Sequence, residues 1–384
     1  MTDTNAPVSY DPYDLWMTSP GVFAKKHFYR GRIIGKLLSV AIGLADWLTP
    51  NVSRAILGAK KRSYPITVAQ WILGQSSIAD SESALRQLMA VSSTRKEEFG
   101  NCWGLGFPWM SKNGLYDENM PFVTHTPYAL EALVKLFTES GDPGFQEKAR
   151  NCFLDSRPFL DGLKIMHQGE TSLALSYAPI EEPRIVVNAN SYAGYSYALH
   201  AKFGENSEGV ASARCKALLH WVVEQQQENG SWYYYADEDA GNFIDGFHSC
   251  FVLKNLIKSA ELIPELKTLI EPAVVQGMSY LQKAFIDQKT GLLRRFTERD
   301  IKDPFVWDLY DQAEYLGLLV LLGKLDEADT FIKVVYQHFH KKGHWYCRKD
   351  FFGRLWGKDF LRWGIMPFIH QQHEYQQAIE KERF

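Results

Sequence analysis

Hydrophobic residues recur every three or four positions along most of the chain, which is the spacing of one face of an amphipathic helix. This periodicity predicts helices over Tyr128–Glu139, Tyr192–Phe203, Ala211–Gln227, Phe247–Leu262, Leu266–Phe285, Tyr310–Leu322, Glu327–Phe339 and Lys358–Glu380. An earlier run with the same spacing extends from Ile33 to Leu48. No comparable pattern supports a sheet, so the sequence predicts an all-α protein without substantial β-structure.

Several of the expected helices are separated by a similar short turn. In each, a glycine ends a helix or turns the chain, and a bulky apolar residue two positions later pins the turn to the core. These turns are Asn229-Gly230-Ser231-Trp232, Thr290-Gly291-Leu292-Leu293 and Lys342-Gly343-His344-Trp345, and Asn101-Cys102-Trp103-Gly104 resembles an earlier, degenerate copy. The interval between successive glycines holds two helices, so each repeat is a helix hairpin that buries its apolar face only against its neighbours.

We therefore expect a single domain over residues 1–384. Its predicted architecture is an α/α toroid, a closed ring of roughly six helix hairpins around a central cavity. An open superhelical solenoid is the alternative. The aromatic and polar loops between the helices favour the closed ring, because in a toroid they would surround one mouth of the barrel.

Composition limits the function classes. The formal net charge is -3, with 46% hydrophobic and 23% charged residues, which is ordinary for a globular protein and argues against a nucleic-acid partner. The 5 cysteines are scattered without paired spacing, which favours a reducing compartment and argues against a zinc site. The start of the chain lacks a basic stretch followed by an apolar run, so we expect a cytoplasmic protein.

The segment from Lys25 to Arg62 differs from the rest of the chain. It holds nine Lys or Arg residues against one acid, Asp46, and they bracket the apolar run from Ile33 to Leu48. The run is too short to span a bilayer. A basic amphipathic helix of this kind could rest on the anionic surface of the inner membrane. The alternative is the first core-facing helix of the barrel, because a packed helix has the same pattern.

The strongest candidate for chemistry is the pair Asp245 and His248. Their i, i+3 spacing places both on one helix face. A carboxylate can orient an imidazole and keep it basic, which suits general acid–base catalysis. The alternative is structural: an aspartate near a helix start is often a cap, and a histidine is often a satisfied core residue.

A second pair, Asp308 and Asp311, occupies the corresponding place in the next repeat. Two carboxylates one helical turn apart raise one another's proton affinity, which can separate an acid from a base. Paired carboxylates also carry glycoside hydrolysis. The alternative of equal weight is a negatively charged first turn, favoured by the helix dipole.

The third cluster leads into the helix near Tyr192. Asn190 or Ser191 could cap this helix, whereas Asn188 could hydrogen-bond a sugar hydroxyl and Tyr192 could act as acid or base. The remaining candidates for substrate binding are aromatic, imidazole or guanidinium side chains: Trp103, His125, Trp232, Tyr233, Tyr235 and Arg354. The chain has no glycine-rich phosphate loop, dinucleotide fingerprint, G-x-S-x-G or H-E-x-x-H motif, so we expect no cofactor and no metal.

Two resemblances follow from these motifs. Gln225 to Trp232 resembles a repeat of terpene cyclases and prenyltransferase β subunits, which are α-toroids, but the aspartate motif of the cyclases is missing. The closer resemblance is to bacterial toroid proteins of exopolysaccharide and O-antigen biosynthesis, related to six-hairpin glycosidases. It covers Trp103 to about Leu262, through Ser176-Tyr177-Ala178-Pro179, Asn188-Ala189-Asn190, Gly230-Ser231-Trp232-Tyr233 and Phe243-Ile244-Asp245-Gly246-Phe247-His248, and includes Arg362-Trp363.

That resemblance implies a bacterial glycan or its lipid-linked precursor as substrate, and a cytoplasmic location. Polysaccharide lyases with a toroid fold use an Asn-His-Tyr-Arg set, and Asn190, His248, Tyr192 and Arg354 would supply these residue types. The leading hypothesis is therefore acid–base chemistry on a polysaccharide intermediate, as hydrolase, lyase or epimerase. The alternatives are an isoprenoid-handling enzyme and a non-catalytic glycan-binding assembly protein. A polar cavity with aromatic rims would favour a sugar substrate, and an apolar cavity would favour an isoprenoid substrate. A cavity filled by side chains would favour the non-catalytic glycan-binding role.

Overall fold

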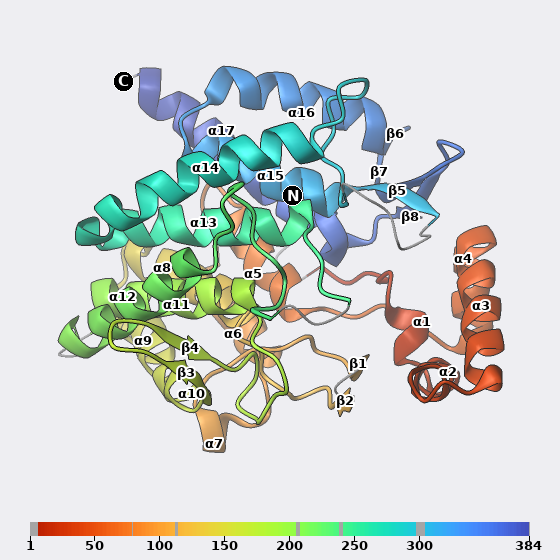
Figure 1. Ribbon diagram of the computed structural model, residues 1–384, viewed down its shortest axis with the longest axis horizontal. Coiled ribbons are helices and arrows are strands. Elements are labelled where there is room, and N and C mark those ends of the chain that lie inside the picture. The colour runs from red at the N-terminus through yellow and green to blue at the C-terminus, as the bar shows by residue number, and fades with distance from the viewer. Residues whose placement is uncertain are drawn as a thin grey trace.

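The computed structural model describes residues 7–78, 80–111, 114–204, 208–237, 241–296 and 304–383 (Figure 1). Six of the described helices form an inner ring: α5 (Pro65–Leu73), α8 (Thr126–Glu139), α11 (Val187–Phe203), α13 (Gly246–Leu262), α15 (Leu309–Leu321) and α17 (Met366–Arg383). Each helix of this ring contacts the next one, and α17 returns to α5. The ring is therefore closed, and the predicted α/α toroid is confirmed.

Outer helices pack against the inner ring. They are α6 (Ser81–Ala90), α9 (Pro143–Leu154), α12 (Glu208–Glu224), α14 (Lys267–Phe285) and α16 (Leu325–Phe339). Two inner helices are covered on all sides over most of their length: every residue from Val187 to His200 in α11 and from Leu309 to Leu319 in α15 is buried. The polar residues within these two stretches must therefore find partners inside the protein.

Short elements lie between the long helices: α7 (Lys96–Phe99), α10 (Arg157–Asp161) and the 3-10 turn Pro264–Leu266. The strands form small antiparallel sheets. β1 (Trp109–Ser111) pairs with β2 (Gly114–Tyr116), and β3 (Ile165–Gln168) pairs with β4 (Leu173–Leu175). The third sheet centres on β7 (His344–Asp350), which pairs with β5 (Phe305–Asp308), β6 (His340–Lys341) and β8 (Leu355–Lys358).

One predicted helix begins too early. The sequence pattern placed it over Lys358–Glu380, but Lys358 ends β8 and α17 begins only at Met366. Gly364 between them has a φ of 94°, in the left-handed region that interrupts a helix. A Cβ at Gly364 would lie 2.5 Å from the backbone nitrogen of Tyr310, so this kink also lets the chain approach α15 closely.

The predicted glycine turns are confirmed. Gly230, Gly291 and Gly343 have φ values of 91°, 73° and 77°. Trp232 and Leu293, two residues after the first two glycines, are buried in the core. The third turn joins β6 to β7, a hairpin that the helical pattern did not predict.

The N-terminal helices stand beside the ring rather than within it (Figure 1). They are α1 (Asp14–Met17), α2 (Ser19–Tyr29), α3 (Ile33–Leu48) and α4 (Pro50–Leu57). The interpretation of Ile33–Leu48 as a core-facing barrel helix is wrong, since Ile33 and Leu37 are 75% and 63% exposed. The guanidinium of Arg54 fastens this group internally through ion pairs to Asp14 and Asp46. Among the described helices, none is both long and apolar enough to cross a membrane.

Candidate active site

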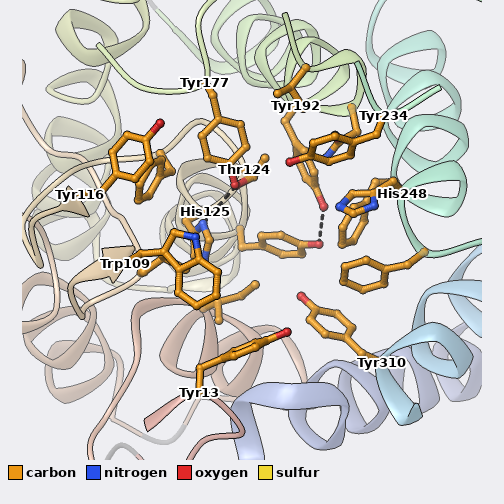
Figure 2. A pocket seen from close by; sticks show the side chains of 18 of the residues that line it. Tyr13, Trp109, Tyr116, Thr124, His125, Tyr177, Tyr192, Tyr234, His248 and Tyr310 are labelled. Atoms are coloured by element: carbon orange, nitrogen blue, oxygen red, sulfur yellow. Dashed lines mark hydrogen bonds between the residues drawn. The ribbon is translucent and has the colours of Figure 1, made fainter. Parts of the chain in front are cut away.

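A cavity of about 360 Å³ opens at one end of the inner ring. Each of the six inner helices reaches it with a residue from its first turns or from just before its start, and Figure 2 shows His125, Tyr192, His248 and Tyr310 among them. The N-terminal ends of all six helices therefore face the cavity, and their dipoles favour negative charge that develops there. The cavity thus lies at one mouth of the barrel, and some of the predicted loop residues gather there.

Aromatic and polar side chains dominate the cavity wall. Of the sequence candidates, His125, Asn188, Tyr192, Tyr235 and His248 line it. Further lining side chains that carry a polar group are Tyr13, Trp109, Tyr116, Thr124, Tyr128, Tyr177, Glu182, Arg184, Tyr234, Arg295, Tyr310, Arg362 and Trp363. Flat rings with polar edges and hydrogen-bonding groups suit a saccharide, whose faces are apolar and whose rim is hydroxylated.

Asp245 and His248 form a hydrogen-bonded pair at the start of α13. Asp245 caps the helix, because its Oδ1 accepts the backbone N–H of His248 at 2.7 Å. Its Oδ2 lies 2.7 Å from Nδ1 of the same histidine. Burial acts to raise the pKa of Asp245, but the charges of His248 and Arg295 outweigh it and hold this pKa below its usual value. The ionised carboxylate can only accept, so Nδ1 donates to it, and Nε2 is the ring nitrogen left outside this pair.

His248 is accessible whereas its partner is not. The side chain of His248 is 26% exposed, and that of Asp245 is 2% exposed beneath it. The imidazole contacts Tyr234, with 4.6 Å between the ring centroids. It also shares Phe251 with Tyr192, at centroid distances of 5.9 and 5.3 Å. His248 and Tyr192 therefore face the same part of the cavity (Figure 2).

A buried chain of hydrogen bonds stands behind Tyr192. The hydroxyl groups of Tyr192 and Tyr128 are 2.8 Å apart, and Nζ of Lys254 donates to Tyr128 at 2.8 Å. Lys254 is also paired with Glu314, at 2.5 Å. Burial raises the pKa of both tyrosines well above the usual value, so both are protonated at neutral pH. Tyr192 can thus donate a proton or a hydrogen bond. Its hydroxyl is connected through that of Tyr128 to the ammonium group of Lys254.

Asp308 and Asp311 do not form the predicted pair of cavity carboxylates. Asp311 binds the Arg295 guanidinium, with Nη2 and Oδ1 2.6 Å apart, and it is fully buried. Asp308 caps α15 and accepts hydrogen bonds from Arg348 and from the indole of Trp363. Arg295 lies between the two carboxylates, because its Nη2 is also 3.7 Å from Oδ2 of Asp308. Their positions fix Arg295 and Trp363, which do line the cavity, so the two aspartates support the wall rather than form it.

His125 occupies a different part of the wall from His248 (Figure 2). Its Nδ1 lies 3.2 Å from the hydroxyl of Thr124, which in turn lies 2.9 Å from the hydroxyl of Tyr177. Burial, assisted by the charge of Arg362, lowers the pKa of His125 to about 3. The ring is therefore neutral at physiological pH. It suits hydrogen bonding to a substrate better than proton abstraction.

Asn188 carries a buried amide oxygen that is unpaired among the described residues. Within the part of the chain that the structure describes, its buried Oδ1 has no hydrogen-bond partner. A buried amide oxygen without a partner costs free energy, which a substrate hydroxyl would recover. Tyr235 completes the wall nearby, with the guanidinium of Arg184 3.7 Å above its ring centroid.

Five predicted binding residues lie elsewhere. Trp103 and Trp232 are buried in the core, and their indoles donate to the backbone oxygens of Leu88 and Val222. Asn190 bonds the backbone of Leu175 through both ends of its amide. Tyr233 is 41% exposed and outside the cavity wall. Arg354 pairs with Asp350 near α3.

The sequence analysis missed several functional candidates. Three of them lie within the inner helices: Tyr128, Lys254 and Glu314. The signal that could have found them is a polar residue inside an otherwise apolar helix. Arg295 and Glu182 lie in irregular segments without a recognisable motif. Tyr13 lines the cavity from the N-terminal segment, where the sequence shows no recognisable motif. For the described residues, no cluster of His, Cys, Asp and Glu could hold a metal ion.

These features define an α/α toroid with one polar, aromatic cavity at the N-terminal ends of its inner helices. At the level of sequence, no family model and no curated protein matches the chain. Solved structures do match its fold. A D-mannose isomerase is similar with a TM-score of 0.58 and 14% identity, over 83% of this chain and 87% of that chain.

Two further structures have the same fold. A cellobiose 2-epimerase from Spirochaeta thermophila has a TM-score of 0.56 and 16% identity, over 84% of this chain and 87% of that chain. A family 105 glycoside hydrolase from C. acetobutylicum has a TM-score of 0.57 and 14% identity, over 82% of this chain and 94% of that chain. The similarity runs over most of each chain, so it independently supports the toroid architecture.

Proposed function

We propose that the protein is an enzyme that transfers protons at a carbon of a saccharide, as an epimerase, an isomerase or a lyase does. The observation that carries the proposal is the Asp245–His248 pair, in which the carboxylate holds Nδ1 and leaves Nε2 as the ring nitrogen that can take a proton, in an aromatic cavity that Tyr192 also lines. His248 removes a proton from a carbon next to a carbonyl or carboxyl group. Tyr192 donates to an oxygen or carbon of the same substrate.

The electrostatics of the wall support this reaction. Negative charge that develops on the substrate oxygen faces six helix N-termini and the guanidinium groups of Arg295 and Arg362. Asn188 and neutral His125 can orient hydroxyl groups. Two structures that share the fold bear the names of an isomerase and an epimerase of sugars, which agrees with this class of chemistry.

Hydrolysis is the less supported form of the hypothesis. A glycosidase places two carboxyl groups roughly 5–10 Å apart on either side of the scissile bond. Among the described residues of the wall, Glu182 is the carboxylate, and it is engaged by the backbone N–H of Tyr177 and the hydroxyl of Tyr116. An isoprenoid substrate fits less well, because imidazole, guanidinium and amide groups in the wall would lose hydration without gaining partners.

Exchange with solvent deuterium tests the proposal. The protein is incubated in heavy water with a panel of sugars, and proton NMR follows their C–H signals. The panel contains reducing mono- and disaccharides, and oligosaccharides with uronic acid residues from which a lyase would form an unsaturated sugar. We expect deuterium to enter one carbon position, or a new unsaturated or epimeric sugar to form. His248→Asn should abolish this change. His344→Asn is the matched control, because His344 forms an exposed pair with Asp359 outside the cavity.

We further propose that the substrate belongs to bacterial polysaccharide biosynthesis, as a polysaccharide or a lipid-linked glycan handled on the cytoplasmic side of the inner membrane. Support comes from the sequence resemblance, whose motifs include Asn188 and His248, both in the cavity wall. The polysaccharide made by cells that lack the protein, compared with that of the parent, tests this assignment. An unchanged polymer structure and yield would contradict it.

A further inference from the structure

The apolar stripe of the N-terminal helices is uncovered. On α3 the exposed large side chains are Ile33, Ile34, Leu37, Val40, Leu44 and Leu48, and on α4 they are Val52 and Ile56. We call these eight residues the docking face. Isolated exposed apolar side chains are common on proteins, but a continuous group on adjoining helices marks an interaction surface. The opposite side of α3 faces the protein through Gly35, Ile42 and Asp46, which are buried.

The charge around the docking face has one sign. Within the segment from Lys25 to Arg62, the exposed charged residues are Lys26, Arg30, Arg32, Lys36, Lys60, Lys61 and Arg62. The one acid in this segment, Asp46, is buried and paired with Arg54. A helix with an apolar stripe and basic flanks matches an anionic bilayer, which offers acyl chains to the stripe and lipid phosphates to the flanks.

A second copy of the chain fits this surface poorly. A twofold dimer interface brings the same patch of both subunits together. In such an interface the basic residues around the two docking faces would lie close together. Their mutual repulsion would be strengthened by the lower dielectric of the interface. The complementary surface is one with negative charge.

The docking face is fixed close to the mouth of the cavity. The ammonium group of Lys25 on α2 lies 3.6 Å above the ring centroid of Trp109, which lines the cavity. Tyr13, just before α1, lines the cavity too, and it contacts Trp109 with 5.2 Å between the ring centroids. From the other side, the indole of Trp47 on α3 donates to Asp350 of β7 at 3.0 Å. Tyr13 and Lys25 therefore tie the start of α1 and α2 to the cavity wall, and α3 and α4, which carry the docking face, pack onto these helices.

We propose that the docking face inserts into the surface of an anionic lipid bilayer and thereby holds the cavity mouth at that surface, where the saccharide part of a lipid-linked substrate can enter. The lipid-linked nature of the substrate rests on the proposed function. Binding to the bilayer itself does not, since it depends only on α2, α3, α4 and the basic residues around them.

Vesicle flotation tests the docking. The full chain is mixed, without any sugar, with vesicles of phosphatidylcholine alone or of phosphatidylcholine with phosphatidylglycerol. We expect flotation with the anionic vesicles only, and at least a tenfold lower bound fraction for the double variant Leu37→Asp/Leu44→Asp. Val275→Asp is the matched control, because Val275 is 69% exposed on α14 and should float like the unmodified protein. Thermal unfolding curves confirm that the variants are folded.

Two results would overturn the proposal. One is equal flotation of the unmodified protein and the double variant. The other is a dimer in sedimentation velocity that the double variant abolishes, together with no flotation of either protein. Hydrogen exchange adds the orientation: anionic vesicles should slow exchange within residues 19–57 and leave α14 unchanged, and protection of α14 instead would contradict the stated face.

Failure of docking is separable from failure of the enzymatic proposal. The double variant should keep the deuterium exchange of a water-soluble sugar, because its substitutions lie outside the cavity wall. A protein that floats but exchanges no deuterium contradicts the proposed function alone. A protein that exchanges deuterium but does not float contradicts the docking alone.

Discussion

The carboxylate of Asp245 holds His248 at two points, since Oδ1 accepts its backbone N–H and Oδ2 accepts its ring N–H, each at 2.7 Å. The same side chain starts α13 and sets the tautomer of the candidate base. The predicted helix cap is thus confirmed, and the same carboxylate orients the imidazole as the acid–base hypothesis requires. Asp245 does not line the cavity itself, so in the proposed function it is a positioning residue, and His248 is the group that would meet substrate.

Asp245→Asn separates these two tasks. The amide oxygen can still cap the helix, so we expect the free energy of unfolding to change by about 1 kcal/mol or less. The amide cannot both cap the helix and stabilise a protonated imidazole, so the rate of deuterium exchange should fall by roughly 10²–10⁴-fold. The rate and the urea unfolding midpoint are measured together, with Asp359→Asn as control. An unchanged rate would show that the pair only caps the helix.

The Lys254–Glu314 pair is expected to serve both stability and proton transfer. Lys254→Met leaves Glu314 buried without its cation, which should destabilise the protein by about 3–5 kcal/mol. The double variant Lys254→Met/Glu314→Gln removes that unpaired charge and should regain most of the stability. It should stay slow in deuterium exchange, because Tyr128 and Tyr192 lose the cation behind them. Recovery of the rate in the double variant would mean that Lys254 is only structural.

His200 should make stability depend on pH. Burial lowers its pKa to about 3, and its ring stacks on Phe153 with 4.4 Å between centroids. The unfolded chain binds a proton near its usual pKa of about 6.5, whereas the folded one resists it. This contribution to stability is full above about pH 6.5 and is lost as the pH falls toward 3, by up to about 1.4 kcal/mol per pH unit.

Urea unfolding between pH 7.5 and pH 5 measures this loss. His200→Gln should unfold at lower urea at pH 7.5 and show a shallower dependence on pH, although His125, which is also buried and shifted, keeps part of the slope. His344→Gln is the exposed control and should follow the unmodified protein. Identical slopes for the His200 variant and the unmodified protein would contradict the assignment.

Gly364 should tolerate no side chain. Its φ is 94°, and an added Cβ would lie 2.5 Å from the backbone nitrogen of Tyr310 and 2.8 Å from the carbonyl carbon of Leu309. Gly364→Ala therefore combines strain with a backbone clash, and we expect a loss of roughly 3 kcal/mol or more. Gly323 has a φ of 66°, and a Cβ added there would meet no atom within 4 Å. Gly323→Ala therefore measures the backbone strain alone, and we expect it to lower the free energy of unfolding by about 1 kcal/mol. Equal unfolding midpoints for the two variants would contradict the close approach.

The sequence predicted the elements that depend on local pattern. The helix periods, the glycine turns and the position of Asp245 at a helix start all follow from residues close together in the chain. The partners of Asp308 and Asp311 could not be predicted, because Arg295 and Arg348 reach them from distant segments. The stripe from Ile33 to Leu48 has the same pattern whether it faces a core or solvent, and only the packing distinguishes the two.

The ion pair between Asp11 and Arg362 joins segments 351 residues apart, and the wall between them carries Tyr13 and Trp363. During synthesis, Asp11 must wait for Arg362 to emerge, about 20–70 s at typical elongation rates. Until then the inner ring cannot close and the cavity lacks one side. The wall of the cavity is therefore completed only after Arg362 has been synthesised, long after the helices α1 to α4.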